Sequence, residues 1–161
     1  MPVFTNPNVN GDTGSRILTY SSGVVTTAPA DVNENTLGSI ILPAGSLGPN
    51  GYLKLSTQIS CTDSAGTKTI WFRINGTNVL ATVFAAGNSS AKYEQWFWNR
   101  NSESANAYQN GNTALGPSAA GVINTSINTA LPLTITLVGQ KSIAGDTLTC
   151  NFFAVEAVYH I

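Results

Sequence analysis

Residues capable of acid–base or nucleophilic chemistry are few and scattered along the chain. His160 is the only histidine and stands next to the last residue, so a Ser-His-Asp triad or a histidine metal site would have to be built at a chain end. The eight acidic residues lie mostly in turn sequences such as Gly145-Asp146, and nothing in the sequence pairs two carboxyl groups as glycoside hydrolysis requires. We therefore expect no catalytic residue, no bound metal and no cofactor.

The two cysteines, Cys61 and Cys150, each lie inside a segment of alternating apolar residues. A disulfide is geometrically possible if the two segments are neighbouring strands. For a chain made in a reducing cytosol, however, two buried thiols are the better interpretation. Neither cysteine is expected to be a nucleophile or a metal ligand.

The run of aromatic residues from Tyr93 to Arg100 is the segment best suited to binding. If this segment is a strand, Trp96 and Trp98 share one face with Glu94 and Arg100, so the indoles lie on its more polar side. Such rings can stack on a sugar or fill a pocket on a partner, and Trp is enriched at interface hot spots. We expect Tyr93, Trp96, Trp98 and Arg100 to form part of a core or subunit interface, with a glycan-binding platform as the alternative.

The elements that position these residues are predicted to be strands. From Arg16 onward, short alternating or β-branched runs are separated by Gly, Asn and Pro, which is typical of an all-β sandwich or barrel. Between Ala91 and Gln109 a short helix also fits the spacing, but a strand through Trp98 followed by a polar loop suits the bulky aromatics better. The expected strands are 17–20, 24–27, 36–42, 52–61, 67–74, 78–84, 93–98, 122–127, 131–138 and 147–159.

Local signals refine two of these strands and the turns around them. Asn75-Gly76 separates two apolar runs and predicts a hairpin with a type I′ turn. Asn50-Gly51 and Asn110-Gly111 indicate two further turns. Trp71 precedes Phe72 on the first strand of the hairpin, and we expect Trp71 to lie in the core.

The closing segment is apolar on both faces for most of its length. This pattern predicts a central strand, or a strand covered on one face by another subunit. Its single carboxylate, Glu156, is expected to pair with a hydroxyl, an amide or an Arg rather than to act as a general acid. The candidate residues for a subunit interface on this strand are Phe153, Val155, Glu156 and Tyr159.

Charge is scarce in this chain and excludes several functional classes. Only 9% of its 161 residues are charged, against about 25% in typical soluble domains, and the formal net charge is -1. The seven basic residues are scattered singly and form no stripe for a nucleic acid. No apolar stretch approaches a membrane span, and the first residues do not resemble a secretion signal. We expect synthesis in a cytosol and a tendency to associate, because 19 Thr, 17 Asn and 15 Ser supply most of the polarity.

The chain is expected to divide into an extended N-terminal arm, residues 1–30, and one β-sandwich domain, residues 31–161. The arm is rich in Pro, Asn and Gly. Because an untethered terminus frays, we expect the arm to lie on the body of the domain or on a neighbouring copy.

Over residues 32–161 the sequence resembles a group of tailed-bacteriophage virion proteins. The likeness rests on an ordered set of turns: Pro43-Ala44-Gly45 after an apolar strand, Asn50-Gly51, and a Lys-Thr strand that ends at Gly76-Thr77. The segment from Asp146 to Val158 also resembles the last strand of that group. The resemblance implies an antiparallel two-sheet β-sandwich of jelly-roll type, commonly trimeric, that serves in capsid decoration, a head fibre or a tail fibre. It brings no catalytic residues.

Two functions therefore remain open from the sequence. The first is an oligomeric structural virion protein, with a trimer favoured, that binds the major capsid protein or other virion proteins on the particle exterior. The second is a glycan-binding or receptor-binding module of a tail fibre or tail tip that uses Tyr93, Trp96 and Trp98. Neither function involves nucleic acid or a membrane.

Overall fold

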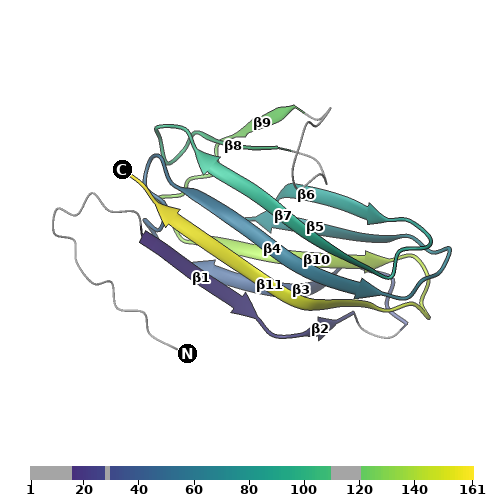
Figure 1. The fold of residues 1–161 in the computed structure, drawn as a ribbon. Helices are drawn as coiled ribbons and strands as arrows, with labels where there is room; N and C mark the ends of the chain where they lie inside the picture. Colours follow the sequence, from purple (N-terminus) through teal and green to yellow (C-terminus); the bar gives the residue numbers. More distant parts are fainter. Residues whose placement is uncertain (1–15, 28–29, 110–120) are drawn as a thin grey trace.

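The computed structural model describes residues 16–27, 30–109 and 121–161, and this part of the chain is an all-β sandwich (Figure 1). Two antiparallel sheets pack face to face, and no helix occurs in the described ranges. The all-β class expected from the sequence is confirmed. In chain order the strands are β1 (Arg16–Ser22), β2 (Val25–Thr26), β3 (Asn35–Leu42), β4 (Tyr52–Cys61), β5 (Lys68–Ile74), β6 (Thr77–Phe84), β7 (Ser90–Asn99), β8 (Asn106–Gln109), β9 (Val122–Thr125), β10 (Leu133–Lys141) and β11 (Leu148–Tyr159).

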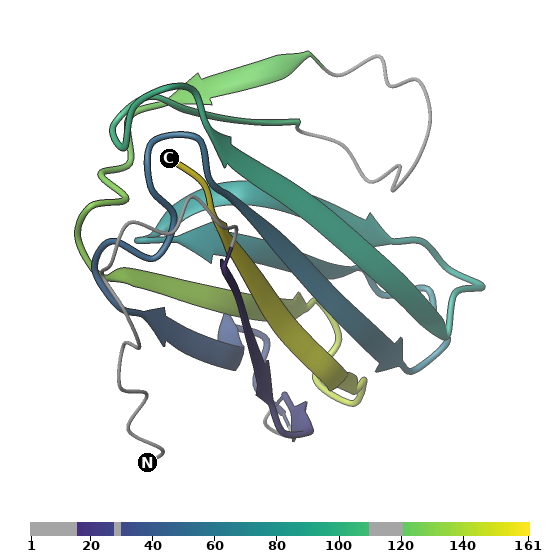
Figure 2. The ribbon, with the colours of Figure 1, turned by 60° about the vertical axis from the view of Figure 1, so that its left-hand side comes forward.

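The strand order is that of a jelly roll. The seven-stranded large sheet runs β1-β11-β4-β7-β8-β9, with β2 also paired to β11, and the four-stranded small sheet runs β3-β10-β5-β6. If β2 and the β8–β9 pair are set aside, the remaining eight strands in chain order form sheets 1-8-3-6 and 2-7-4-5, which is jelly-roll connectivity. The β8–β9 pair extends the large sheet beyond β7 (Figure 2).

All ten expected strands are present, although their bounds shift by a few residues. The turn at Asn75-Gly76 has positive φ values of 47° and 81°, as a type I′ hairpin requires. The region from Ala91 onward is a strand rather than a helix. Strand β8 was missed, because its short sequence was interpreted as polar loop. The turn expected at Asn110-Gly111 lies outside the described residues.

A β-bulge in β11 changes which side chains face the core. The register of β11 against β4 shifts between Cys150 and Phe152, so the alternation reverses at Asn151. Phe153 is therefore fully buried and stacks on Phe72 of the small sheet, with ring centroids 6.0 Å apart, whereas Phe152 is 43% exposed. The strand is central, as expected, because it lies between β1 and β4. Its inner face, however, is filled by this chain's own core.

The prediction that Trp71 lies in the core is wrong. Its neighbour Phe72 is buried, whereas Trp71 is half-buried on the outer face of the small sheet. The guanidinium of Arg73 lies 5.4 Å from the Trp71 ring centroid and forms two hydrogen bonds of 2.8 Å to the Glu34 carboxylate. These bonds lower the pKa of Glu34 and raise that of Arg73.

Part of the expected N-terminal arm belongs to the sandwich. Residues 16–22 pair along their length with β11, and 25–26 pair with its first residues. Residues 1–15 and 28–29 lie outside the described residues. The arm therefore reaches the body of the domain by backbone pairing from Arg16 onward, which adds the edge strand of the large sheet.

Candidate functional site

The outer face of the large sheet carries the aromatic residues that the sequence singles out. In β7 the side chains alternate, with Phe97 buried in the core and Trp96 and Trp98 on the outer face beside Glu94. Trp96 is 43% exposed and Trp98 is half-buried. The expected shared face of the two indoles is therefore present.

Tyr52 is the ring that the sequence analysis missed. In the antiparallel register of β4 and β7, Tyr52 faces Trp98 and Lys54 faces Trp96. The Tyr52 ring stacks diagonally on Trp96, with centroids 5.2 Å apart and planes inclined by 30°. We call Tyr52, Trp96 and Trp98 the aromatic patch. The sequence could have indicated Tyr52, because this residue starts the predicted half-buried strand 52–61 at an outward-facing position.

Charged side chains border the aromatic patch on one side. Lys54 Nζ lies 5.9 Å from the Trp96 ring centroid and 3.5 Å from Glu94 Oε1, and Lys92 Nζ lies at the same distance from that oxygen. Tyr52 and Glu94 occupy rows on opposite sides of Trp96 in the register, and Lys54 Nζ lies over the Trp96 ring while it reaches toward Glu94.

A buried amide network fixes the end of the sheet where the aromatic patch lies. Asn99 follows Trp98 and points inward, and its Nδ2 donates to the Gly48 carbonyl oxygen at 2.6 Å and to Thr129 Oγ1 at 2.7 Å. Asn106 Nδ2 donates to Asn99 Oδ1 at 2.7 Å. Because Gly48 belongs to the loop that leads into β4, Asn99 ties together the chain segments that carry Tyr52 and Trp98.

Gly51 allows that loop to pass close to β11. A Cβ atom at Gly51 would collide with the carbonyl oxygens of Leu47 and Val158. The Gly51 carbonyl oxygen also accepts a hydrogen bond from the Asn99 backbone amide at 2.9 Å. Only glycine therefore fits at the position before Tyr52, and this close approach sets where Tyr52 leaves the loop.

Two other predicted site residues lie away from the patch. Tyr93 points toward the core, where its ring meets Phe84 edge-on at 5.7 Å, so it is not on the same face as Trp96. Arg100 follows the strand, and its Nη1 donates to Asn124 Oδ1 of β9 at 2.6 Å. Arg100 therefore braces the β8–β9 extension rather than flanking the indoles.

The closing-strand candidates divide between the two faces of the large sheet. Phe153 and Val155 are fully buried in this chain's own core, so they are not available to another subunit. Tyr159 is half-buried and packs over Gly48. Glu156 faces Lys54 in the register and is half-buried, and it has no hydrogen bond or ion pair with any described residue. Of the four candidates, Glu156 alone stands beside the aromatic patch.

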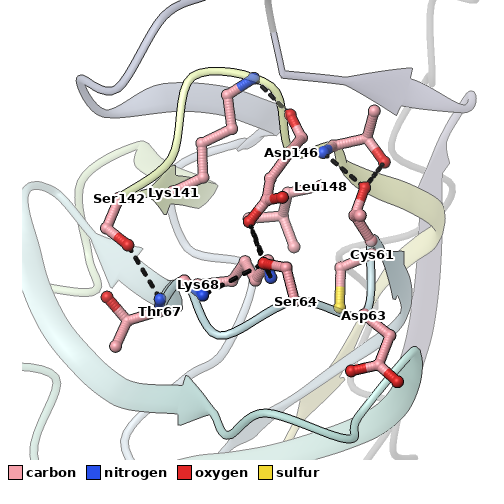
Figure 3. Close-up of polar contacts among 12 residues, drawn as sticks. Cys61, Asp63, Ser64, Thr67, Lys68, Lys141, Ser142, Asp146 and Leu148 are labelled. Carbon is pink, nitrogen blue, oxygen red and sulfur yellow. Dashed lines mark hydrogen bonds and ion pairs between the residues drawn. The ribbon is translucent and has the colours of Figure 1, made fainter.

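A second polar cluster lies at the opposite end of the sandwich (Figure 3). Lys68 Nζ is 2.9 Å from Asp146 Oδ2, and both side chains are almost fully buried. Ser64 Oγ donates to the same oxygen at 2.6 Å and accepts a hydrogen bond from Lys68 at 2.7 Å. Lys141 Nζ donates to the Asp146 carbonyl oxygen at 2.6 Å. The cluster joins the loop 62–67 to the loop 142–147.

This cluster holds a serine beside a lysine but does not form a nucleophile–base pair. The hydrogen bond from Ser64, followed by that from Lys68, lowers the pKa of Asp146, so the carboxylate stays ionised. Ser64 donates its proton to Asp146 and accepts a hydrogen bond from Lys68, whereas nucleophilic activation would require Lys68 to accept the Ser64 proton. The arrangement is a buried ion pair that closes one end of the fold.

The remaining reactive groups are isolated. Cys61 and Cys150 lie on neighbouring strands as free thiols, and burial raises the pKa of both. His160 is exposed, and its Nδ1 lies 2.9 Å from the Ile161 carbonyl oxygen. Within the described ranges, no three His, Cys, Asp or Glu side chains gather as a metal site, and no helix is long and apolar enough to span a bilayer.

Comparisons with known proteins give weak similarities of fold. No protein-family model matches the chain, and no curated protein sequence matches it at a significant level. Dimeric latent PorU from Porphyromonas gingivalis is 13% identical over 89% of this chain and 12% of its own, with a TM-score of 0.45. The CBM2 module of the evolved Dit of Lactobacillus casei BL23 phage J-1 is 10% identical over 74% of this chain and 68% of its own, with a TM-score of 0.39.

A third similarity is to the infectious bursal disease virus Gx strain. It is 14% identical over 99% of this chain and 36% of that one, with a TM-score of 0.40. This chain thus spans only a small part of PorU and about a third of the bursal virus chain. Because every TM-score is below 0.5, these similarities assign no function to this chain. The fold and the site define a jelly-roll sandwich with an aromatic patch on the outer face of its large sheet.

Proposed function

We propose that this chain is a structural virion protein of a tailed bacteriophage that binds the particle exterior through the outer face of its large sheet. The observation that carries the proposal is the aromatic patch, in which Trp96 stays 43% exposed although Tyr52 stacks on one of its faces. Exposed aromatic rings set in a sheet face, with polar groups at their border, are typical of protein-contact hot spots.

The charge distribution around the patch supports a protein partner. Glu94 lies 3.5 Å from both Lys54 and Lys92, and Glu156 faces Lys54 in the register, so two carboxylates match the two lysines at this border. The whole chain carries a formal net charge of -1, which gives little repulsion between copies crowded on a particle. The uncharged Asn, Ser and Thr surface suits contacts with neighbouring coat proteins.

The sequence resemblance to phage virion proteins supplies the finer expectations. A homotrimer is favoured, the location is capsid decoration or head fibre, and the partners are the major capsid protein or other virion proteins. The protein would reside in the virion after synthesis in the host cytoplasm. We assign it no enzymatic role, because Ser64 donates to Asp146 and Lys68 donates to Ser64, which is not the arrangement of a nucleophile and its base.

Co-sedimentation with purified particles that lack the chain tests the proposal. The double variant Trp96→Ala/Trp98→Ala should lose most of its particle binding. Ile41→Ala, which removes a 64% exposed apolar side chain from the outer face of the small sheet, should bind as the wild type does. Equal binding by the wild type and the double variant would refute the role of the patch.

Glycan or receptor binding at the same face is the second candidate. The half-buried carboxylate of Glu156 has no partner in the described part of the chain and lies beside Lys54, so it could accept hydrogen bonds from sugar hydroxyls. For a sugar to stack on Trp96, the Lys54 side chain must move away from its position over the Trp96 ring. Titration with host surface polysaccharide should then show tighter binding by Lys54→Ala and weaker binding by Glu156→Gln. If the face is a protein interface instead, neither the wild type nor either of the two variants should bind the polysaccharide.

A further inference from the structure

Strand β6 is an edge of the small sheet, and it lacks most of the features that usually protect an edge. Its sequence, Thr-Asn-Val-Leu-Ala-Thr-Val-Phe, contains no charged residue and no proline. Beyond its pairing with β5, no backbone group of β6 is hydrogen-bonded to another part of the described chain. Natural sheets usually block such edges with charges, prolines, bulges or covering segments, because free N–H and C=O groups template a further strand.

The bulge in β6 leaves most of the strand regular. The register against β5 shifts near Val79, but from Leu80 to Phe84 each residue has a single partner on β5. Val83 is 56% exposed on the outer face of the sheet. The five residues after the bulge therefore form a regular, uncharged template.

The other three edges of the sandwich are less open. Strand β3 is flanked by β1 and β2 of the large sheet, which contact it. Strand β1 carries the charged residue Arg16, and β9 is only four residues long. Of the four edges, β6 is therefore best suited to accept another strand.

Thr82 supplies a second, independent observation on the same strand. Its side chain is only 4% exposed, yet its Oγ1 has no hydrogen-bond partner in the described structure. A buried hydroxyl without a partner typically costs about 1–3 kcal/mol, so native structures usually satisfy such groups. The hydroxyl without a partner therefore lies on the same strand that lacks a neighbouring strand.

We propose that β6 pairs antiparallel with β6 of a second copy of this chain, with Thr82 opposite Thr82 of that copy. In this register Ala81 faces Val83 of the other copy and Leu80 faces Phe84, so the segment is complementary to itself. Directly opposed threonines on one sheet face can bond through their hydroxyls, so each Oγ1 satisfies the other. The chain's small net charge does not oppose the pairing.

The pairing is isologous and has two-fold symmetry. It joins two small sheets into one eight-stranded sheet and leaves the outer face of each large sheet free. The proposal therefore does not depend on the aromatic patch. It adds a contact between two protomers, or between two trimers, to the function proposed above.

The mass of the full chain in solution tests the proposal. By sedimentation equilibrium we expect a reversible two-fold association that Ala81→Lys/Val83→Lys weakens at least about tenfold, because four lysines would then meet at the edge. The control Ile41→Lys/Thr134→Lys adds the same charge at exposed positions on the same face, at the other side of the small sheet, and should associate as the wild type does. Identical association of wild type and Ala81→Lys/Val83→Lys would overturn the proposal.

Thr82→Val separates the hydroxyl contact from folding. Valine has the same shape without the hydroxyl, so the protomer should be as stable as the wild type or more stable, while two-fold association weakens. A more stable protomer with unchanged association would show that the hydroxyls do not meet, and would overturn this register. Particle binding through the aromatic patch should be unaffected by any of these variants, so the two proposals fail separately.

Discussion

The phenol ring of Tyr52 stacks on the indole of Trp96, with ring centroids 5.2 Å apart, and so joins β4 to β7 on the outer face of the large sheet. The contact leaves an aromatic side chain 43% exposed in the middle of a structured face. Aromatic pairs of this kind contribute about 0.5–1.5 kcal/mol beyond their buried area. Tyr52 therefore holds Trp96 in a fixed orientation, which suits a residue that contacts a partner.

Trp96→Ala should weaken binding much more than folding. Loss of the stacked pair should cost about 1 kcal/mol of unfolding free energy, measured by urea denaturation. Affinity for the particle should fall by roughly 30-fold or more, as expected for a hot-spot residue worth about 2 kcal/mol. If Trp96→Ala lowers the unfolding free energy and the free energy of particle binding by equal amounts, Trp96 serves the fold alone.

Asn99→Ala should destabilise the end of the sandwich that carries the patch. The variant leaves the Gly48 carbonyl oxygen and Thr129 Oγ1 without their buried donor. We expect a loss of about 1–3 kcal/mol in unfolding free energy. Asn151→Ala is the matched control, because it removes one exposed hydrogen bond to Ser60 and should cost less than about 0.5 kcal/mol.

The bulge in β11 predicts opposite outcomes for two adjacent phenylalanines. Phe153→Ala empties a fully buried site against Phe72 and should cost about 3–5 kcal/mol. Phe152→Ala removes a 43% exposed side chain and should cost less than about 1 kcal/mol. Similar losses for the two variants in thermal or urea unfolding would contradict the assigned register.

Because of the same bulge, strict alternation along this strand does not give the correct faces. Strict alternation places Phe152 with Cys150, but the extra residue at Asn151 moves Phe153 onto the face of Cys150. Nothing in the local sequence marks the bulge, because both candidate faces are apolar. Strand β4, with a clean alternation and an Asn-Gly turn before it, was predicted with its bounds.

The aromatic patch was predictable only in part. The alternation within β7 places Trp96 and Trp98 together and requires no partner strand. The contribution of Tyr52 depends on the register between β4 and β7, which one strand alone does not reveal. Trp71 was misassigned for a related reason, since the choice between two faces depends on what the neighbouring sheet covers.

Acid should destabilise the protein partly through Asp146. Hydrogen bonds from Ser64 and Lys68 hold its pKa below the ordinary value of 3.8, so the folded state favours the ionised carboxylate. This contribution is fully present above the unfolded-state pKa and is lost as the pH falls through the lower folded-state pKa. Stability should therefore vary little through Asp146 at neutral pH and decline below about pH 4.

Variants at two aspartates isolate that effect. Asp146→Asn should be less stable than the wild type at neutral pH, because buried Lys68 loses its counter-charge, and should show a shallower decline below pH 4. Asp63→Asn is the control, since Asp63 is exposed and accepts one hydrogen bond from the Gly87 amide. An acid-unfolding curve for Asp146→Asn with the wild-type slope would contradict the role of the ion pair.

A cryo-electron-microscopy reconstruction of virions produced with this chain tests the central claim most directly. The account predicts density for the jelly-roll sandwich on the particle exterior, with Tyr52, Trp96 and Trp98 in contact with a neighbouring virion protein. Absence of the chain from purified particles would contradict the account. So would a bound chain whose large sheet faces solvent.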